Sequence, residues 1–263
     1  MMLESQFDRI LQKAVSDSTF RELLFSNKAQ ALEGYHLSAD DLVYINALTP
    51  VKLHSIIGGM ITHRLTPIRI AERFVILPEL LNHDPQPGDI NIILNSSWAF
   101  GNGTNATTEL SLASIGRHIH IGNTVLDLGT GTGILSIASA VLGAASVAAY
   151  DVDTLAIESA RRNIKLNQVE NIVNVELGTL QDALGKNQQG WDLVVVNILA
   201  PVFLKMLAEG LERTMHPDSR LIVSAIRGDE LEAVLSALTQ NGLTLIEHCE
   251  LRSWHTVVAR KVA

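Results

Sequence analysis

Short apolar runs alternate with amphipathic segments through the second half of the chain. The runs are nearly continuous in Val, Ile and Leu, and the intervals between them repeat apolar residues at helical spacing. Such an alternation is typical of a parallel sheet that helices cover on both faces. The expected strands span 124–128, 146–150, 172–176, 192–197 and 220–225. The expected helices span about 134–142, 154–166, 199–213 and 229–241.

The end of the chain departs from this alternation. Two further strands, about 243–250 and 254–260, follow one another with no helix between them. Strands joined by a short connection form a hairpin, so we expect the last strand to run antiparallel to the rest. Earlier apolar runs at 74–77 and 90–94 also predict strands. The fold class is therefore α/β.

The first sixty or so residues have a different pattern. Apolar residues recur at helical spacing over 7–14, and Thr19 begins a capping box that predicts a helix over 19–32. We therefore expect a small helical domain, 1–62, followed by a larger domain, 63–263. The small domain either recognises a substrate or partner, or is a packing appendage, and the sequence favours neither role.

Composition narrows the class of protein. The 263 residues are 47% hydrophobic, which excludes a disordered chain, and their formal net charge is -8 with basic residues scattered singly. A phosphate backbone attracts clustered Lys and Arg, so we do not expect nucleic acid as a partner. The start lacks a signal peptide, and no apolar stretch reaches the ~18 residues of a membrane helix. We expect a cytoplasmic protein that does not enter membranes.

The sequence gives little indication of a metal site or of a catalytic nucleophile. His118 and His120 are two positions apart, but they lie near a predicted helix end, where a cation is favourable. No cluster of carboxylates or thiols accompanies them, so we expect no metal site. Cys249 is the single cysteine. No Gly-x-Ser-x-Gly elbow, P-loop or Cys-x-x-Cys motif occurs in the chain.

A glycine-rich turn joins the strand at 124–128 to the helix that follows it. Asp127 ends the strand, and Gly129, Gly131 and Gly133 occupy alternate positions after it. Such a turn lets the backbone approach a ligand closely and exposes the N–H groups of the helix N-terminus. Three alternating glycines at this junction indicate a cofactor loop rather than an ordinary turn.

Two classes of cofactor compete for this loop. A dinucleotide fingerprint counted from Gly129 requires glycine at Ile134, whereas this chain has Gly133. A pyrophosphate is also anionic, and the acidic Asp127 stands just before the glycines. An acid suits the cationic end of S-adenosylmethionine better than a phosphate. The loop therefore favours S-adenosylmethionine as the cofactor.

The ends of the next two strands complete the expected cofactor site. Asp151 ends the second strand about twenty residues beyond the glycines, where an acid accepts hydrogen bonds from ribose hydroxyls. Asp153 is expected instead to cap the following helix. Gly178 and Thr179 follow the third strand, where we expect the adenine ring to lie.

Several segments together resemble one family. They are the glycine loop and the stretches Pro67–Arg73, Trp98–Thr108, Asp192–Pro201 and Trp254–Val258. Their order and sequences are similar to those of the ribosomal protein L11 methyltransferase family, over about residues 67–263. The resemblance implies the class I methyltransferase (Rossmann-like) fold, with a seven-stranded sheet whose last strand is antiparallel.

The resemblance also implies an activity and further site residues. It implies that Phe100, Gly101 and Thr104 close over the methionine end of the cofactor. It implies that Asn197 lies at the edge of the methyl-transfer site, where it contacts the cofactor and orients an acceptor amine. The activity would be S-adenosylmethionine-dependent N-methylation of a protein or peptide. An asparagine just after a buried Val run agrees, because ligands bind at the carboxyl ends of parallel strands.

Two departures from the family keep alternatives open. The family usually has His-Pro where this chain has Asn105 and Ala106, and its N-terminal domain is ferredoxin-like rather than helical. A small-molecule methyltransferase and a non-catalytic cofactor-binding protein are the alternatives. At the level of single residues, Asn197 is also a candidate cap for the helix that follows it.

Overall fold

The computed structural model describes residues 17–37, 67–71, 73–78, 86–95, 105–186 and 189–262, with isolated residues between 6 and 53. The chain divides into two compact units, Met1–His63 and Arg64–Ala263, which are described separately. Within the described residues, none of the helices has the length and apolar character needed to cross a bilayer.

The N-terminal unit contains helices α2 (Ser18–Ser26) and α3 (Lys28–Ala31). The predicted capping box at Thr19 is wrong, because Asp17 caps α2 and accepts a hydrogen bond from a first-turn N–H at 3.0 Å. The predicted single helix over 19–32 is also interrupted at Asn27, whose side chain caps α3. Asp and Asn are both strong N-caps, so each begins a helix of its own here.

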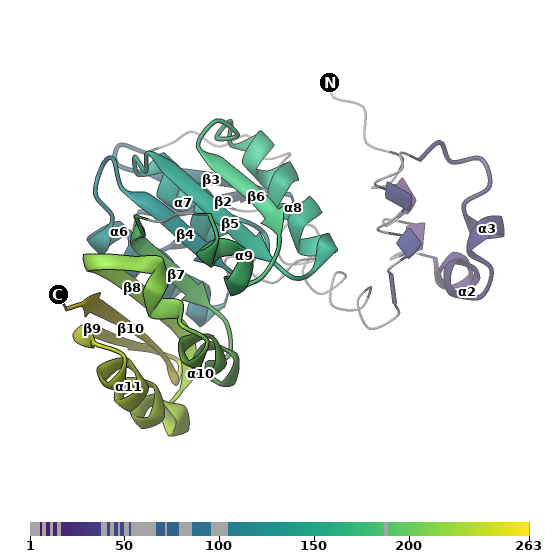
Figure 1. Ribbon diagram of the computed structural model, residues 1–263. Helices are drawn as coiled ribbons and strands as arrows, with labels where there is room; N and C mark the ends of the chain where they lie inside the picture. The colour runs from purple at the N-terminus through teal and green to yellow at the C-terminus, as the bar shows by residue number, and fades with distance from the viewer. Residues whose placement is uncertain are drawn as a thin grey trace. The chain divides into compact units, whose positions relative to one another are not determined.

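Two sheets build the second unit (Figure 1). The smaller sheet has the order β1-β2-β3 and comprises β1 (Ile68–Ile70), β2 (Phe74–Pro78) and β3 (Ile90–Leu94). The larger has the order β6-β5-β4-β7-β8-β10-β9. Its strands are β4 (Thr124–Leu128), β5 (Ser146–Asp151), β6 (Val173–Leu177), β7 (Trp191–Asn197), β8 (Met215–Arg227), β9 (Leu243–Leu251) and β10 (Trp254–Lys261).

Helices cover both faces of the larger sheet, as the continuous apolar strands predict. The helices are α6 (Ala106–His118), α7 (Ile134–Val141), α8 (Thr154–Leu166), α9 (Leu180–Leu184), α10 (Ala200–Ala208) and α11 (Leu231–Gln240). One buried apolar cluster joins α6, α7, α8 and the smaller sheet to one face, and a second joins α9, α10 and α11 to the other. Each face of the sheet therefore has its own core.

The hairpin prediction is confirmed. Strand β10 pairs antiparallel with both β8 and β9, whereas β4, β5, β6, β7 and β8 pair in parallel. The predicted helix over 199–213 is shorter, since α10 ends at Ala208 and Gly210 adopts a φ of 98° before a 3-10 turn at Leu211–Thr214. A left-handed φ cannot continue a helix, and glycine adopts it at little cost.

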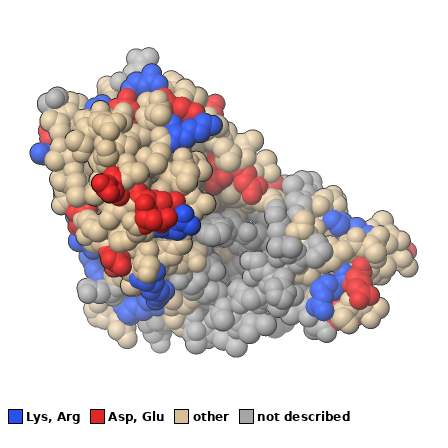
Figure 2. All heavy atoms as spheres, turned by 90° about the horizontal axis from the view of Figure 1, so that it is seen from below, with Lys and Arg blue, Asp and Glu red and all other residues tan. Residues whose placement is uncertain are grey.

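Charged side chains are interspersed on the surface. On the face drawn in Figure 2, blue and red groups are scattered among tan residues over the described part of the second unit, and no single blue patch covers it. A surface that tracks a phosphate backbone needs Lys and Arg gathered into one patch or stripe. The described part of this face therefore lacks the electrostatic pattern of a nucleic-acid interface.

Candidate cofactor and methyl-transfer site

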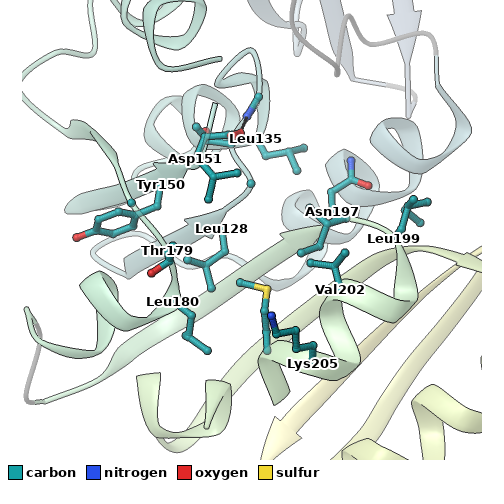
Figure 3. Close-up of a pocket in the computed structure, with 18 of the residues that line it drawn as sticks. Leu128, Leu135, Tyr150, Asp151, Thr179, Leu180, Asn197, Leu199, Val202 and Lys205 are labelled. Carbon is teal, nitrogen blue, oxygen red and sulfur yellow. Dashed lines mark hydrogen bonds between the residues drawn. The ribbon is translucent and has the colours of Figure 1, made fainter. Parts of the chain in front are cut away.

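A cavity of about 630 Å³ opens at the carboxyl ends of strands β4 to β7 (Figure 3). Its volume lies within the ~300–1,000 Å³ of ordinary small-molecule sites. Six of the predicted site residues line it together, namely Gly129, Gly131, Asp151, Gly178, Thr179 and Asn197. Parallel strands place the residues that follow them at one edge of the sheet, so residues distant in sequence meet there.

The glycine loop requires glycine for two different reasons. Gly129 has a φ of 78°, and a Cβ at this position would lie 2.6 Å from Cγ2 of Ile198. Gly133 has a φ of 81°, and its Cβ would lie 3.2 Å from Cβ of Ala160 in α8. Gly129 therefore allows the loop to pass beside the end of β7, whereas Gly133 allows α7 to pack closely on α8.

Asp127 and Gly133 are not among the residues that line the cavity. The Asp127 carboxylate is fully buried beneath the loop, where its Oδ2 accepts hydrogen bonds from Thr130 Oγ1 at 2.8 Å and Ser136 Oγ at 2.6 Å. Its Oδ1 has no hydrogen-bond partner among the described residues. Burial raises the pKa of Asp127 to about 6, although the two hydroxyls act to lower it. In this structure Asp127 anchors the loop to α7.

Asp151 connects the end of β5 to the glycine loop. Its Oδ2 accepts the Gly131 N–H at 2.9 Å, and its Oδ1 accepts the Asp153 N–H at 3.0 Å. A carboxylate offers about four acceptor positions, so Asp151 retains capacity for ribose hydroxyls. Asp153 caps α8 by accepting the Leu155 N–H at 2.9 Å, which confirms the role predicted for it.

Gly178 and Thr179 lie where β6 passes into α9. A Cβ on Gly178 would lie 2.9 Å from Cδ1 of Tyr150, so only glycine fits beside this buried ring. The Thr179 hydroxyl takes part in a capping box with Asp182. Its side chain therefore serves the start of α9, and Tyr150 forms part of the cavity wall beside it.

Asn197 ends β7 and lies at the mouth of the cavity (Figure 3). It does not cap the following helix, because Leu199 is the N-cap of α10. Its side-chain amide makes no hydrogen bond to the part of the chain that the structure describes. Across the parallel register it is paired with Ser224 of β8. An amide in this position offers an oxygen acceptor and two N–H donors to a ligand.

Several lining residues were not anticipated from the sequence. Thr107 and Thr108 reach the cavity from the first turn of α6, and Ala225 reaches it from β8. Helix α10 contributes Val202 and Lys205. The helix could have been anticipated, because it begins directly after the strand that Asn197 ends. No local signal marks Ala225, which adopts a φ of 61° although it is not glycine.

The departure at Asn105 and Ala106 falls at the start of α6. Asn105 is the N-cap and makes no side-chain cap hydrogen bond, and Ala106 is the first helical residue. Proline is favoured at this first position because its missing N–H and restricted φ suit the helix start. Alanine is compatible with the same start, so α6 forms without the family's His-Pro pair. The predicted residues Phe100, Gly101 and Thr104 lie outside the described residues.

Comparison with known proteins identifies the family of the chain. Residues 60–262 match the family described as Ribosomal protein L11 methyltransferase (PrmA). The chain is similar to the ribosomal protein L11 methyltransferase of Exiguobacterium sp., with 40% identity over 74% of this chain and 61% of the relative. For that of Bacillus subtilis the identity is 39%, over 74% of this chain and 62% of the relative. The chain thus spans less than two thirds of the length of these curated relatives.

A solved structure is also similar. The ribosomal protein L11 methylase of Lactobacillus delbrueckii subsp. bulgaricus matches with a TM-score of 0.66 and 29% identity, over 75% of this chain and 99% of that chain. A precorrin-6y C5,15-methyltransferase of Geobacter metallireducens, 16% identical with a TM-score of 0.52, shares the fold alone. These matches confirm the predicted class I methyltransferase fold. The chain belongs to the ribosomal protein L11 methyltransferase family.

Proposed function

We propose that the protein is an S-adenosylmethionine-dependent methyltransferase that N-methylates an amino group of a protein, with ribosomal protein L11 as the substrate. One observation carries the proposal. The amide of Asn197, which bonds to none of the described residues, lines the same cavity as Gly129 and Asp151, so an acceptor group held there lies beside the expected cofactor site. The names of the relatives, which are ribosomal protein L11 methyltransferases, point to the same chemistry.

The cavity suits the proposed cofactor. Gly129 and Gly131 present bare backbone, and Asp151 keeps acceptor capacity for ribose hydroxyls. The adenine ring would lie beside Gly178 and Thr179. When bound, S-adenosylmethionine supplies a methyl group on a cationic sulfur. The closure by Phe100, Gly101 and Thr104 stays a prediction.

The described residues also suit an amine acceptor. In the proposed mechanism the Asn197 Oδ1 accepts an N–H of the acceptor amine and so directs its lone pair. Orientation of this kind supplies ~7–11 kcal/mol of the barrier. A lysine of pKa ~10.4 is mostly protonated near neutral pH, which is a handicap of ~4 kcal/mol. Apolar side chains at the cavity, Leu199 and Val202 among them, lower the pKa of a bound amine by desolvation.

The test uses the purified protein, S-adenosylmethionine with a labelled methyl group, and recombinant ribosomal protein L11. We expect label on amino groups of L11, located by mass spectrometry. The Asn197→Ala variant should weaken S-adenosylmethionine binding by about tenfold or less in calorimetry, whereas it should slow methyl transfer by about a hundredfold. Cofactor binding without transfer to L11, peptides or cell extract would instead indicate a non-catalytic protein. Transfer to small amines alone would indicate a small-molecule methyltransferase.

We propose further that the N-terminal unit recognises the substrate. The family match begins at residue 60, so this unit, Met1–His63, lies almost wholly outside it. A variant that lacks residues 1–60 should keep its affinity for S-adenosylmethionine and lose transfer to L11. If transfer to L11 stays at the wild-type rate while cofactor binding is intact, the unit is a packing appendage.

A further inference from the structure

A chain of buried hydroxyls lies behind the cavity. The Oγ of Ser224 lies 3.0 Å from the carbonyl oxygen of Thr107 and 2.6 Å from Oγ1 of Thr256. All three residues are buried. A carbonyl oxygen only accepts, so the Ser224 hydroxyl donates to Thr107 and Thr256 donates to Ser224. The chain therefore has one direction, and it joins β10, β8 and the first turn of α6.

The hydroxyl chain coincides with a β-bulge. Between β8 and β10, His255 pairs with Ile226 and Val257 pairs with Val223. Two residues of β8, Ser224 and Ala225, therefore lie opposite the single residue Thr256 of β10. Bulges re-aim side chains and are common next to active sites. Here the bond between the Ser224 and Thr256 hydroxyls links the strands at the place where the ladder is irregular.

The bulge reaches the cavity at the end that we assign to the acceptor. Ser224 is the register partner of Asn197, and the adjacent Ala225 lines the cavity with a φ of 61°. A left-handed φ at a residue other than glycine persists only where surrounding contacts hold it. Thr107 and Thr108, in the first turn of α6, also line the cavity. One hydroxyl chain thus ties together two neighbouring parts of the cavity lining, the bulge of β8 and the first turn of α6.

We propose that Ser224 and Thr256 are positioning residues for methyl transfer. They hold the bulge and the first turn of α6 together, and so fix the part of the cavity lining where the acceptor amine meets Asn197. This inference rests on the proposed function. Neither hydroxyl is among the residues that line the cavity, so they act through Ala225 and Thr107 rather than by contact with a substrate.

The alternative is that these hydroxyls are only satisfied polar groups of the core, and the chain offers a matched control. Thr214 is equally buried, and its Oγ1 donates to the Leu211 carbonyl at 2.7 Å. It lies just before β8 begins, whereas the cavity lies at the carboxyl ends of the strands. Thr214→Val therefore removes a buried hydroxyl of the same kind away from the site.

The experiment compares Ser224→Ala, Thr256→Val, Thr256→Ser and Thr214→Val with the wild-type protein. Each is measured for S-adenosylmethionine affinity by calorimetry, for kcat and KM with ribosomal protein L11, and for Tm. We expect Ser224→Ala and Thr256→Val to lower kcat about ten- to a hundredfold, because small displacements of reacting groups are costly. Their cofactor affinity should stay within about threefold of wild type. Thr256→Ser keeps the hydroxyl and should keep kcat.

Three outcomes would overturn the proposal. One is a kcat for Ser224→Ala and Thr256→Val that equals that of wild type. Another is an equal fall in kcat for Thr214→Val, which would show a general effect of lost stability. The third is a Thr256→Ser variant as impaired as Thr256→Val. Failure of the proposed function gives a distinguishable result, because the wild-type protein itself would then transfer no methyl group. The positioning role would be refuted together with the function.

Discussion

The backbone N–H of Gly131 donates a hydrogen bond of 2.9 Å to the carboxylate of Asp151. This contact joins the middle of the glycine loop to the end of the neighbouring strand β5, twenty residues further along the chain. The same carboxylate lines the cavity. Asp151 thus holds the loop and lines the cavity at once, and its two oxygens have more acceptor positions than the backbone uses.

Replacement of Asp151 is therefore expected to weaken cofactor binding. A charge-assisted hydrogen bond contributes ~1.5–3 kcal/mol, so Asp151→Ala should weaken S-adenosylmethionine roughly ten- to a hundredfold by calorimetry. Asp153→Ala is the control, because it removes only the cap of α8. It should cost about 1 kcal/mol of stability and leave the affinity unchanged. Equal affinity for wild type and Asp151→Ala would refute the assignment.

Gly129→Ala separates backbone strain from steric clash. The new Cβ would have a positive φ and would lie 2.6 Å from Cγ2 of Ile198. Gly242→Ala is the matched control, since Gly242 has a φ of 71° and nothing within 4 Å of an added Cβ. The control should lose about 1 kcal/mol of free energy of unfolding, because alanine at a positive φ is strained even without a steric clash.

Gly129→Ala should therefore lower Tm by more than Gly242→Ala does, by ~2–4 °C for each further kcal/mol. The difference should shrink in the double variant Gly129→Ala/Ile198→Ala, because Cγ2 is then absent. Equal losses in the two single variants would mean that the loop relaxes away from Ile198.

Asp127 should make the stability of the protein depend on pH. Burial raises its pKa to about 6, so between its ordinary value and about 6 the folded protein binds this proton more tightly than the unfolded chain does. The contribution of Asp127 to the free energy of unfolding is thus present at low pH and lost as pH rises to about 6. Asp127→Asn removes this dependence.

The free energy of unfolding of Asp127→Asn, taken relative to that of wild type, should rise by up to about 3 kcal/mol from about pH 4 to pH 7. This is the equivalent of about two pKa units. Urea unfolding at both pH values measures this change, and any pH-independent cost of the amide cancels in the comparison. A constant difference between variant and wild type across that range would show that Asp127 titrates normally.

Glu247 in β9 should act in the opposite direction. Its Oε2 lies 3.0 Å from Nε of Arg117 and 3.0 Å from Nε2 of His118, both in α6. Partial burial acts to raise the pKa of Glu247, but these hydrogen bonds outweigh burial and lower the pKa to about 2. Its contribution is therefore present near neutral pH and lost as pH falls below its ordinary value toward about 2.

Near pH 7 the free energy of unfolding of Glu247→Gln should be lower than that of wild type by about 1 kcal/mol or less. The Arg117 side chain is 46% exposed, so solvent screens its ion pair with Glu247. Near pH 2 the variant and the wild type should unfold alike in urea. An equal deficit at both pH values would mean that the amide disturbs packing rather than removing a charge.

The sequence by itself determined the strand order of the larger sheet, most of its helices and the place of the cavity, although it did not indicate α9. Parallel strands buried on both faces need continuous apolar residues, and the helices between them need an amphipathic pattern, so both are visible locally. The glycine loop, Asp151 and Asn197 follow directly after such strands. Topology then brings them to one edge of the sheet, which is why Asn197 could be anticipated.

Only the tertiary structure decided which polar groups meet. Asp127 turns beneath the loop because Ser136 and Thr130 supply hydroxyls there, and a sequence pattern does not show which way a carboxylate points. The bulge at Ala225 arises from the pairing of β8 with β10, whose residues lie about thirty positions apart. No local propensity marks a left-handed alanine, because the energy that holds it comes from contacts between strands. For the same reason, the hydroxyl chain behind the cavity has no sequence signature.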